Sequence, residues 1–177
     1  AQNTVIIYTS DNGYFCGSHG YGSKVLPYEE STRVPLIVYD PRQANSNQGL
    51  RCGALSGLVD VAPTLLNLAE VPVPENMDGG NLMELYANSN GRIHDALPLI
   101  NVWGHPATHA LGIVTKERKY IFWPFADDGM QATEELYHLG KDASEMINRA
   151  GHTEEQAALT QMRSSYDALV AQWKTDA

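Results

Sequence analysis

The chain has 177 residues, 43% of them hydrophobic, which is enough to bury the core of one domain or of a domain with a small second unit. Its formal net charge of −9 argues against nucleic acid as a partner, because phosphate binding requires a basic face. No apolar run in the sequence is long enough to span a membrane. The two cysteines, Cys16 and Cys52, lie far apart and neither prove nor exclude a disulfide.

The first predicted element is a strand over residues 4–9, where apolar and β-branched residues run directly into a polar turn. Such a run predicts a strand that is buried on both faces. In open α/β sheets, ligands bind at the carboxyl end of a strand of this kind. The Gly-rich residues 14–27 predict a loop, and residues 34–39 predict a second buried strand that ends at Asp40-Pro41.

The middle of the chain predicts one helix and a long connection. Residues 56–70 have a helical apolar stripe, with Ser56 as the expected N-cap and Pro63 near the first turn. Residues 75–91 predict a loop with one short helical turn at 82–86. Near Leu97 the pattern changes to short strands.

The last third of the chain predicts a small antiparallel sheet covered by a helix. Short strands are expected at residues 111–115, 118–123 and 134–139, with an Asp-Asp-Gly turn at 127–129. A helix is expected from Thr153, which would form a capping box with Gln156. Its apolar face would carry Leu159, Met162, Tyr166, Leu169 and Trp173.

The loop after the first strand carries the first candidate site. Asp11 and Asn12 place a carboxylate and an amide oxygen side by side, and Gly13 allows a sharp turn behind them. Hard oxygen donors of this kind suit calcium or magnesium rather than zinc. The alternative is that Asp-Asn-Gly is only a turn, since all three residues favour turns.

The surrounding residues resemble the sulfatase family, which is part of the alkaline-phosphatase-like superfamily. Three blocks carry the resemblance, in the family's order and over almost the whole chain, and together they are specific where one alone would be weak. The first block comprises Ser10-Asp11-Asn12-Gly13, His19-Gly20, Lys24, Tyr28-Glu29-Glu30-Ser31 and Arg33-Val34-Pro35-Leu36-Ile37-Val38. The second comprises residues 58–66 and Asp78-Gly79, and the third comprises Lys119-Tyr120-Ile121 and Glu135-Leu136-Tyr137.

The resemblance implies a fold and its division into domains. The expected class is α/β: part of an alkaline-phosphatase-like sheet sandwiched by helices, plus a small carboxy-terminal antiparallel sheet with a covering helix. Residues 1–96 would be the carboxy-terminal part of the catalytic domain, and residues 97–177 the small subdomain. The family's nucleophile is a Cys or Ser in a Cys/Ser-x-Pro-x-Arg motif, converted to formylglycine and located upstream. Neither Cys16 nor Cys52 fits that motif, so the chain resembles a truncated sulfatase that is inactive alone.

The resemblance also implies roles for site residues. Asp11 and Asn12 would be two of the ligands of a calcium ion, with magnesium possible, and the missing upstream part would supply the rest. Lys24 is similar to the lysine that contacts the sulfate and the formylglycine. His19 would reach the substrate and help protonate the leaving group, which suits its pKa. The alternative for His19 is a hydrogen bond within the structure, and Ser18 stands where related sequences often have Glu.

Three further residues have open roles. His105 and His109, beside Trp103, would line the substrate pocket, although such residues are more often surface or packing groups. Arg33 is expected to have a structural role, orienting a carboxylate such as Glu29 or Glu30.

The hypothesis from the sequence is a calcium-dependent sulfatase that cleaves a sulfate ester, with a sugar as the expected substrate. One rival is a phosphate or phosphonate ester hydrolase of the same superfamily, because fold does not settle substrate. The other rival is a non-catalytic fragment that acts as a binding module. An isolated sheet would expose its edges and an apolar face, so the expected partner is the missing upstream part or an oligomer partner. Family resemblance favours a periplasmic or secreted location.

Overall fold

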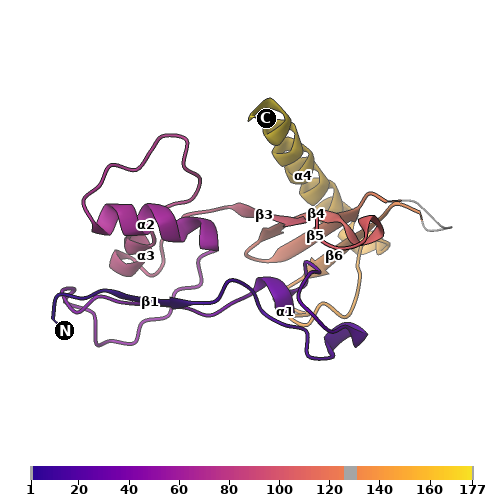
Figure 1. Ribbon diagram of the computed structural model, residues 1–177. Helices are drawn as coiled ribbons and strands as arrows, with labels where there is room; N and C mark the ends of the chain where they lie inside the picture. The colour runs from indigo at the N-terminus through magenta and orange to yellow at the C-terminus, as the bar shows by residue number, and fades with distance from the viewer. Residues whose placement is uncertain (1, 126–130, 177) are drawn as a thin grey trace. The chain divides into compact units, whose positions relative to one another are not determined.

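The computed structural model describes residues 2–125 and 131–176, and its helices and strands fall into two compact units (Figure 1). The first unit contains the residues up to Asp11 together with Val34–Leu97. The second contains Asn12–Arg33 together with the residues from Pro98 onward. The units therefore differ from the predicted division at 96/97, because residues 12–33 belong with the carboxy-terminal part. We call residues 12–33 the site segment.

The first unit contains a two-stranded antiparallel sheet. β1 (Ile6–Thr9) pairs with β2 (Leu36–Tyr39) in a register that sets Ile6 opposite Tyr39. The two strands lie where the sequence predicts them, but the expectation that they are buried on both faces is wrong for this chain. Ile6 is 55% exposed and Tyr8 is 60% exposed. A ribbon of two strands has no second layer of its own, so its apolar side chains stay accessible.

The predicted helix of the first unit forms in two parts. A 3₁₀ turn, η2 (Leu58–Asp60), leads into α2 (Val61–Leu68), and a shorter helix, α3 (Leu82–Ala87), follows at the predicted helical turn. Ser56 is not the N-cap. Instead the Gly57 N–H donates to Oδ2 of Asp60 (2.8 Å), because the chain turns into η2 one residue later. Pro63 is tolerated in the first turn of α2, where a backbone N–H has no intrahelical acceptor.

Asp60 holds the loops of the first unit together. Its side chain is fully buried, and its Oδ1 accepts a hydrogen bond from the Gly80 N–H (2.7 Å) and lies 2.6 Å from Nε2 of His94. Gly79 has a φ of 92°, and a Cβ there would lie 2.3 Å from the Val59 carbonyl oxygen. The close approach of these two chain segments therefore requires glycine.

The second unit is built on a four-stranded antiparallel sheet with the strand order β3-β4-β5-β6. The strands are β3 (Ala96–Asn101), β4 (Ala110–Thr115), β5 (Arg118–Trp123) and β6 (Thr133–His138). The last three match the predicted strands to within one residue at each end. β3 was not predicted, because Pro98 interrupts its pattern; proline is tolerated there because β3 is an edge strand. The turn expected at 127–129 lies outside the described residues.

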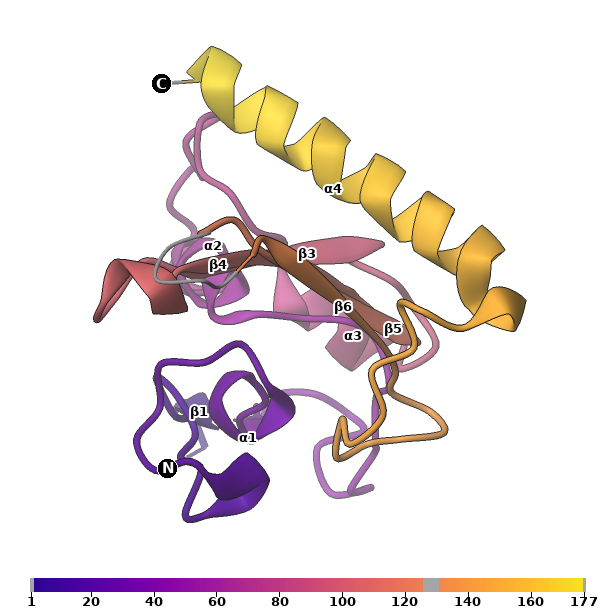
Figure 2. The same ribbon diagram turned by 90° about the vertical axis from the view of Figure 1, so that its right-hand side faces the viewer.

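A long helix covers one face of this sheet (Figure 2). α4 (Gln156–Asp176) follows the 3₁₀ turn η4 (Thr153–Glu155) and buries Leu159 and Met162 as predicted. The predicted capping box is wrong, because Gln156 begins α4 and its Nε2 donates back to the carbonyls of Ala150 (3.0 Å) and His152 (3.2 Å). Within the described part of the chain, no helix is both long and apolar enough to cross a membrane.

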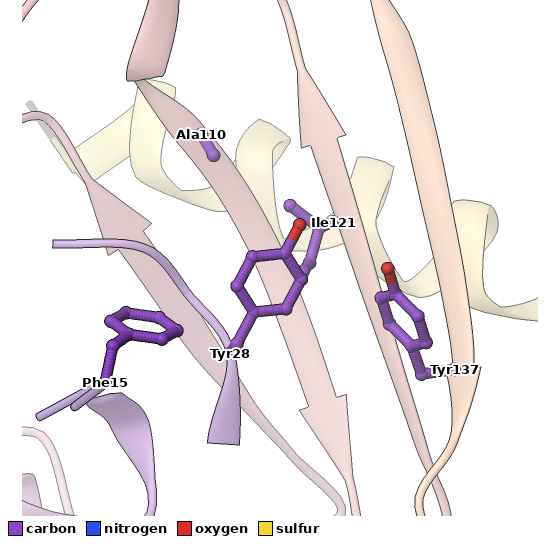
Figure 3. Close-up of a cluster of buried hydrophobic side chains, with 5 residues drawn as sticks. All are labelled: Phe15, Tyr28, Ala110, Ile121 and Tyr137. Carbon is purple, nitrogen blue, oxygen red and sulfur yellow. The ribbon is translucent and has the colours of Figure 1, made fainter. Parts of the chain in front are cut away.

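The site segment covers the opposite face of the sheet. It contains the 3₁₀ turn η1 (Ser18–Gly20) and the short helix α1 (Glu29–Thr32). Phe15 and Tyr28 of this segment form a buried cluster with three residues of the sheet, Ala110, Ile121 and Tyr137 (Figure 3). Side chains alternate along a strand, so β5 sends Ile121 toward the site segment while the adjacent Tyr120 contacts Tyr166 of α4. The burial of Phe15 and Tyr28 explains why the site segment belongs to the second unit.

Candidate active site

The turn after β1 is shaped by a close approach of two backbones. The Gly13 N–H donates to the Ser31 carbonyl (2.8 Å), which ties the start of the site segment to α1. A Cβ at position 13 would lie 1.9 Å from the Glu30 carbonyl oxygen. Only glycine fits this contact, so the turn at Asp-Asn-Gly is held in place by α1.

Asn12 and Lys24 meet within the site segment although eleven residues separate them. Nζ of Lys24 lies 2.9 Å from Oδ1 of Asn12, and Nδ2 of Asn12 donates to the Gly13 carbonyl (2.7 Å). The amide is thereby oriented with its oxygen toward the lysine. A hard oxygen donor and a fixed cation stand side by side, an arrangement suited to a charged oxyanion and a metal ion.

Asp11 and Asn12 are the residues predicted to bind calcium. Asp11 ends the first unit, with its Oδ1 3.4 Å from Oγ of Ser10, and Asn12 opens the second. Both supply hard oxygens, but calcium takes six to eight oxygen ligands, by general rule. In residues 2–125 and 131–176 there is no group of three or more His, Cys, Asp or Glu side chains placed to hold a metal. The metal-binding role of Asp11 and Asn12 therefore stays a prediction.

His19 lies in the packed part of the site segment. Its ring stacks on Tyr28, with centroids 4.6 Å apart and planes 16° apart, and its Nε2 is 3.4 Å from Oε2 of Glu30. The His19 side chain is 12% exposed, and its φ of 55° is unusual for a residue other than glycine. His19 therefore has structural partners beside it, and its predicted role toward a substrate stays a prediction.

His105 and His109 flank the 3₁₀ turn η3 (Pro106–Thr108) in the second unit. His105 is exposed and caps this turn, with its Nδ1 accepting a hydrogen bond from the Ala107 N–H (3.3 Å). His109 is half-buried, and its ring meets the edge of Phe125 at 5.7 Å. Trp103 is 78% exposed. The contacts of both histidines are local ones, and their predicted place in a substrate pocket stays a prediction.

A buried ion cluster anchors α1 and was missed by sequence reasoning. Lys119 is fully buried on β5, and its Nζ lies 2.9 Å from both Oε1 of Glu29 and Oε1 of Glu145. Oε2 of Glu145 accepts a hydrogen bond from the Glu29 N–H (2.6 Å). Burial raises the pKa of Glu145, and Lys119 opposes that shift. The signal in the sequence was the period of the strand, which puts Lys119 on the same buried face as Ile121.

Two tyrosine hydroxyls under the site segment share one carboxylate. The Tyr28 hydroxyl lies 3.1 Å from Oε2 of Glu135, and the Tyr137 hydroxyl lies 3.0 Å from the same oxygen. Burial, and then the charge of Glu135, raise the pKa of both tyrosines. The hydroxyls thus stay protonated as donors. Arg33 contacts Glu29 at 3.7 Å, in line with the structural role expected of it.

Comparison with known proteins agrees with the motifs. Residues 17–172 match the family described as N-sulphoglucosamine sulphohydrolase, C-terminal. A curated relative, the N-acetylglucosamine-6-O-sulfatase of Bacteroides thetaiotaomicron, is 34% identical over 171 residues, which cover 91% of this chain and 29% of the relative. The chain spans about a third of the length of the curated relatives that it matches, 32% and 29% for two of them.

Solved structures give the same result. The structure of BT4656 in complex with its substrate D-glucosamine-2-N,6-O-disulfate matches with a TM-score of 0.85 and 31% identity, over 98% of this chain and 35% of that one. The phosphonate monoester hydrolase of Agrobacterium radiobacter matches with a TM-score of 0.78 and 23% identity, over 97% of this chain and 36% of that one. The second likeness shows the shared fold alone. With its motifs, its fold and the family match over residues 17–172 in agreement, the chain belongs to the sulfatase family and has the alkaline-phosphatase-like fold of that family.

Proposed function

We propose that this chain is the carboxy-terminal part of a calcium-dependent sulfatase that hydrolyses sulfate esters of sugars. The observation that carries the proposal is the contact between Lys24 and Asn12, 2.9 Å apart, next to Asp11. It brings together the cation expected at the sulfate and one of the oxygens expected at the metal. The match to the sulfatase family supports this assignment of roles.

Each of these side chains has a defined task in the proposed reaction. Lys24 binds a sulfuryl oxygen and offsets the negative charge that develops there. Asp11 and Asn12 would hold the metal, which when bound would supply further positive charge near the sulfuryl oxygens. Asn12 also orients Lys24, since its Oδ1 faces the ammonium group. His19 donates a proton to the leaving oxygen, and Glu30, 3.4 Å from Nε2 of His19, holds the ring in place.

The substrate class rests on two similar proteins. One relative is a sulfatase named for 6-O-sulfated N-acetylglucosamine, and a solved neighbour holds a disulfated glucosamine. Both support a sulfated amino sugar as the substrate of this protein. His105 and His109, with the exposed Trp103, are our candidates for contacts to the sugar, because aromatic and imidazole groups pair an apolar surface with hydrogen-bonding atoms.

The proposal includes a preceding part of the same protein. That part would supply the formylglycine nucleophile and the remaining metal ligands, so the 177 residues alone are expected to be inactive. It would also cover the exposed apolar side chains of Ile6, Tyr8 and Ile37 on the first sheet. A second copy of the chain is the alternative cover, and sedimentation of the isolated chain distinguishes a dimer from a monomer.

The test uses the full-length protein and glucosamine 6-sulfate as the probe. Lys24→Ala is expected to lower kcat/KM by about 100- to 1000-fold, the usual cost of removing one charge-stabilising group. The matched control is Lys116→Ala, which removes an exposed lysine from the turn between β4 and β5. Chelation should abolish activity and calcium should restore it. Full activity of the Lys24 variant would refute the role of Lys24.

The same assay separates the proposal from its rivals. Matched sulfate and phosphate monoesters should be cleaved at different rates, with the sulfate preferred. A preference for the phosphate or phosphonate ester would assign the protein to the other branch of the superfamily. Absence of hydrolysis in the intact, calcium-loaded protein would favour the binding module.

A further inference from the structure

The short helix α1 contacts every part of the site segment that carries a candidate site residue. Its Ser31 carbonyl accepts from the Gly13 N–H, next to Asn12 (2.8 Å). Its Ser31 hydroxyl donates to the Lys24 carbonyl. Its Glu30 carboxylate lies 3.4 Å from His19. One helical turn therefore connects three positions that are otherwise separated along the loop.

We propose that Ser31 is a positioning residue that sets the Asn12–Lys24 pair, and that the buried cation of Lys119 fixes Ser31 by anchoring α1. This inference rests on the proposed function and deepens it. Ser31 touches neither substrate nor metal in this scheme. It acts through the two backbone positions that it holds.

The hydroxyl of Ser31 has a specific geometric effect. The segment from Ser18 to Ser23 includes residues with positive φ, among them His19 at 55° and Ser23 at 72°, so the backbone leading to Lys24 is strained. A strained loop keeps one conformation only where its surroundings hold it. Ser31 is buried, with 6% of its surface exposed, and its hydroxyl is directed to the carbonyl of the residue that carries the ammonium group.

The Lys119 cluster prevents α1 from moving. Lys119 contacts Glu29 and Glu145 at 2.9 Å each, and it donates to Oγ1 of Thr32 (3.3 Å). These contacts hold both ends of α1, with Ser31 between them. A buried cation with several partners is costly to leave unpaired, so it resists any shift of the helix away from the sheet.

A double-mutant cycle tests the inference in the full-length protein. Ser31→Ala is expected to lower kcat/KM by about 10- to 100-fold, the size of effect that follows a small misplacement of a reacting group. In a Lys24→Ala background the same change should lower kcat/KM by a factor several times smaller, because one of the two groups that Ser31 positions is gone. A merely structural role would give the same factor in both backgrounds.

The matched control is Thr64→Val, which removes another buried hydroxyl, in the first unit. Oγ1 of Thr64 donates to the Asp60 carbonyl (2.6 Å) and accepts from the Leu82 N–H (2.8 Å). Its loss should lower the melting temperature without any dependence on Lys24. Equal factors for Ser31→Ala in the two Lys24 backgrounds, or an unchanged kcat/KM, would overturn the inference.

Hydrogen exchange separates a failure of this inference from a failure of the proposed function. If the wild-type protein hydrolyses no sulfate ester, the proposed function fails, and the positioning role is still measured at the Gly13 amide. Ser31→Ala should increase the exchange rate of that amide at least about tenfold, since α1 loses one of its ties to the segment. Ser164→Ala, on the exposed face of α4, should leave it unchanged. An unchanged rate in the Ser31 variant would refute the positioning role.

Discussion

Replacing Lys119 by methionine should destabilise the second unit strongly. Lys119 is fully buried, and two carboxylates, from Glu29 and Glu145, lie 2.9 Å from its Nζ. Methionine keeps most of the apolar part of the side chain but removes the only cation in contact with Glu145 in the described structure. Removing one member of a buried ion pair costs about 3–5 kcal/mol, because an unpaired charge remains. We expect a loss of this size at neutral pH.

The loss should depend on pH in a defined direction. Burial raises the pKa of Glu145 above its ordinary 4.5, and Lys119 works against that rise. Because the pKa of Glu145 is raised, its contribution to stability is fully present below pH 4.5. That contribution is lost as the pH rises through the pKa of Glu145 in the folded state. Without Lys119 the pKa rises further, so the destabilisation should be larger at neutral pH than near pH 4.5.

Tryptophan fluorescence during urea unfolding measures this effect. All three tryptophans, Trp103, Trp123 and Trp173, belong to the second unit, so the signal follows that unit alone. The double variant Lys119→Met/Glu145→Gln should recover part of the loss, since one unpaired charge is gone. A loss below about 1 kcal/mol, or one that does not change with pH, would refute the account of Lys119 as a required buried cation.

Two further predictions concern other ionised side chains. Asp60→Ala should destabilise the first unit by about 3 kcal/mol, because the N–H groups of Gly57 and Gly80 lose their buried acceptor; faster hydrogen exchange at those two amides checks this. The hydrogen bonds from Arg163 lower the pKa of Glu134. Glu134 therefore stabilises the fold at pH values above 4.5, its ordinary pKa, and this contribution is lost as the pH falls through the lowered pKa of the folded state. Glu134→Gln should therefore reduce the loss of stability below pH 4.5, as measured by tryptophan fluorescence. If stability falls with pH as steeply as in the wild type, the stabilising role of the Glu134–Arg163 ion pair is refuted.

Local pattern was sufficient for most elements of the second unit. Alternating side chains placed β4, β5 and β6 to within one residue, and the helical stripe placed α4, because these periods follow from backbone geometry alone. The order of the motifs was sufficient to identify the family and to select Asp11, Asn12 and Lys24 as candidate site residues. The predictions failed where a hydrogen-bond partner or a proline overrides the local pattern. These were the caps expected at Ser56 and Gln156 and the strand that contains Pro98.

The contacts that hold the site were decided by tertiary structure. The sequence by itself determined which residue types stand in the site segment, but not that Ser31 meets Lys24 or that His19 stacks on Tyr28. Lys119 was named only as part of a motif block, and it becomes the anchor of α1 through carboxylates that are distant in sequence. The sequence pattern also did not predict that Ile6 and Tyr8 on the first sheet are exposed. The physical reason is that burial and charge pairing depend on which surfaces meet in space, whereas a sequence pattern reports only the conformation of the neighbouring backbone.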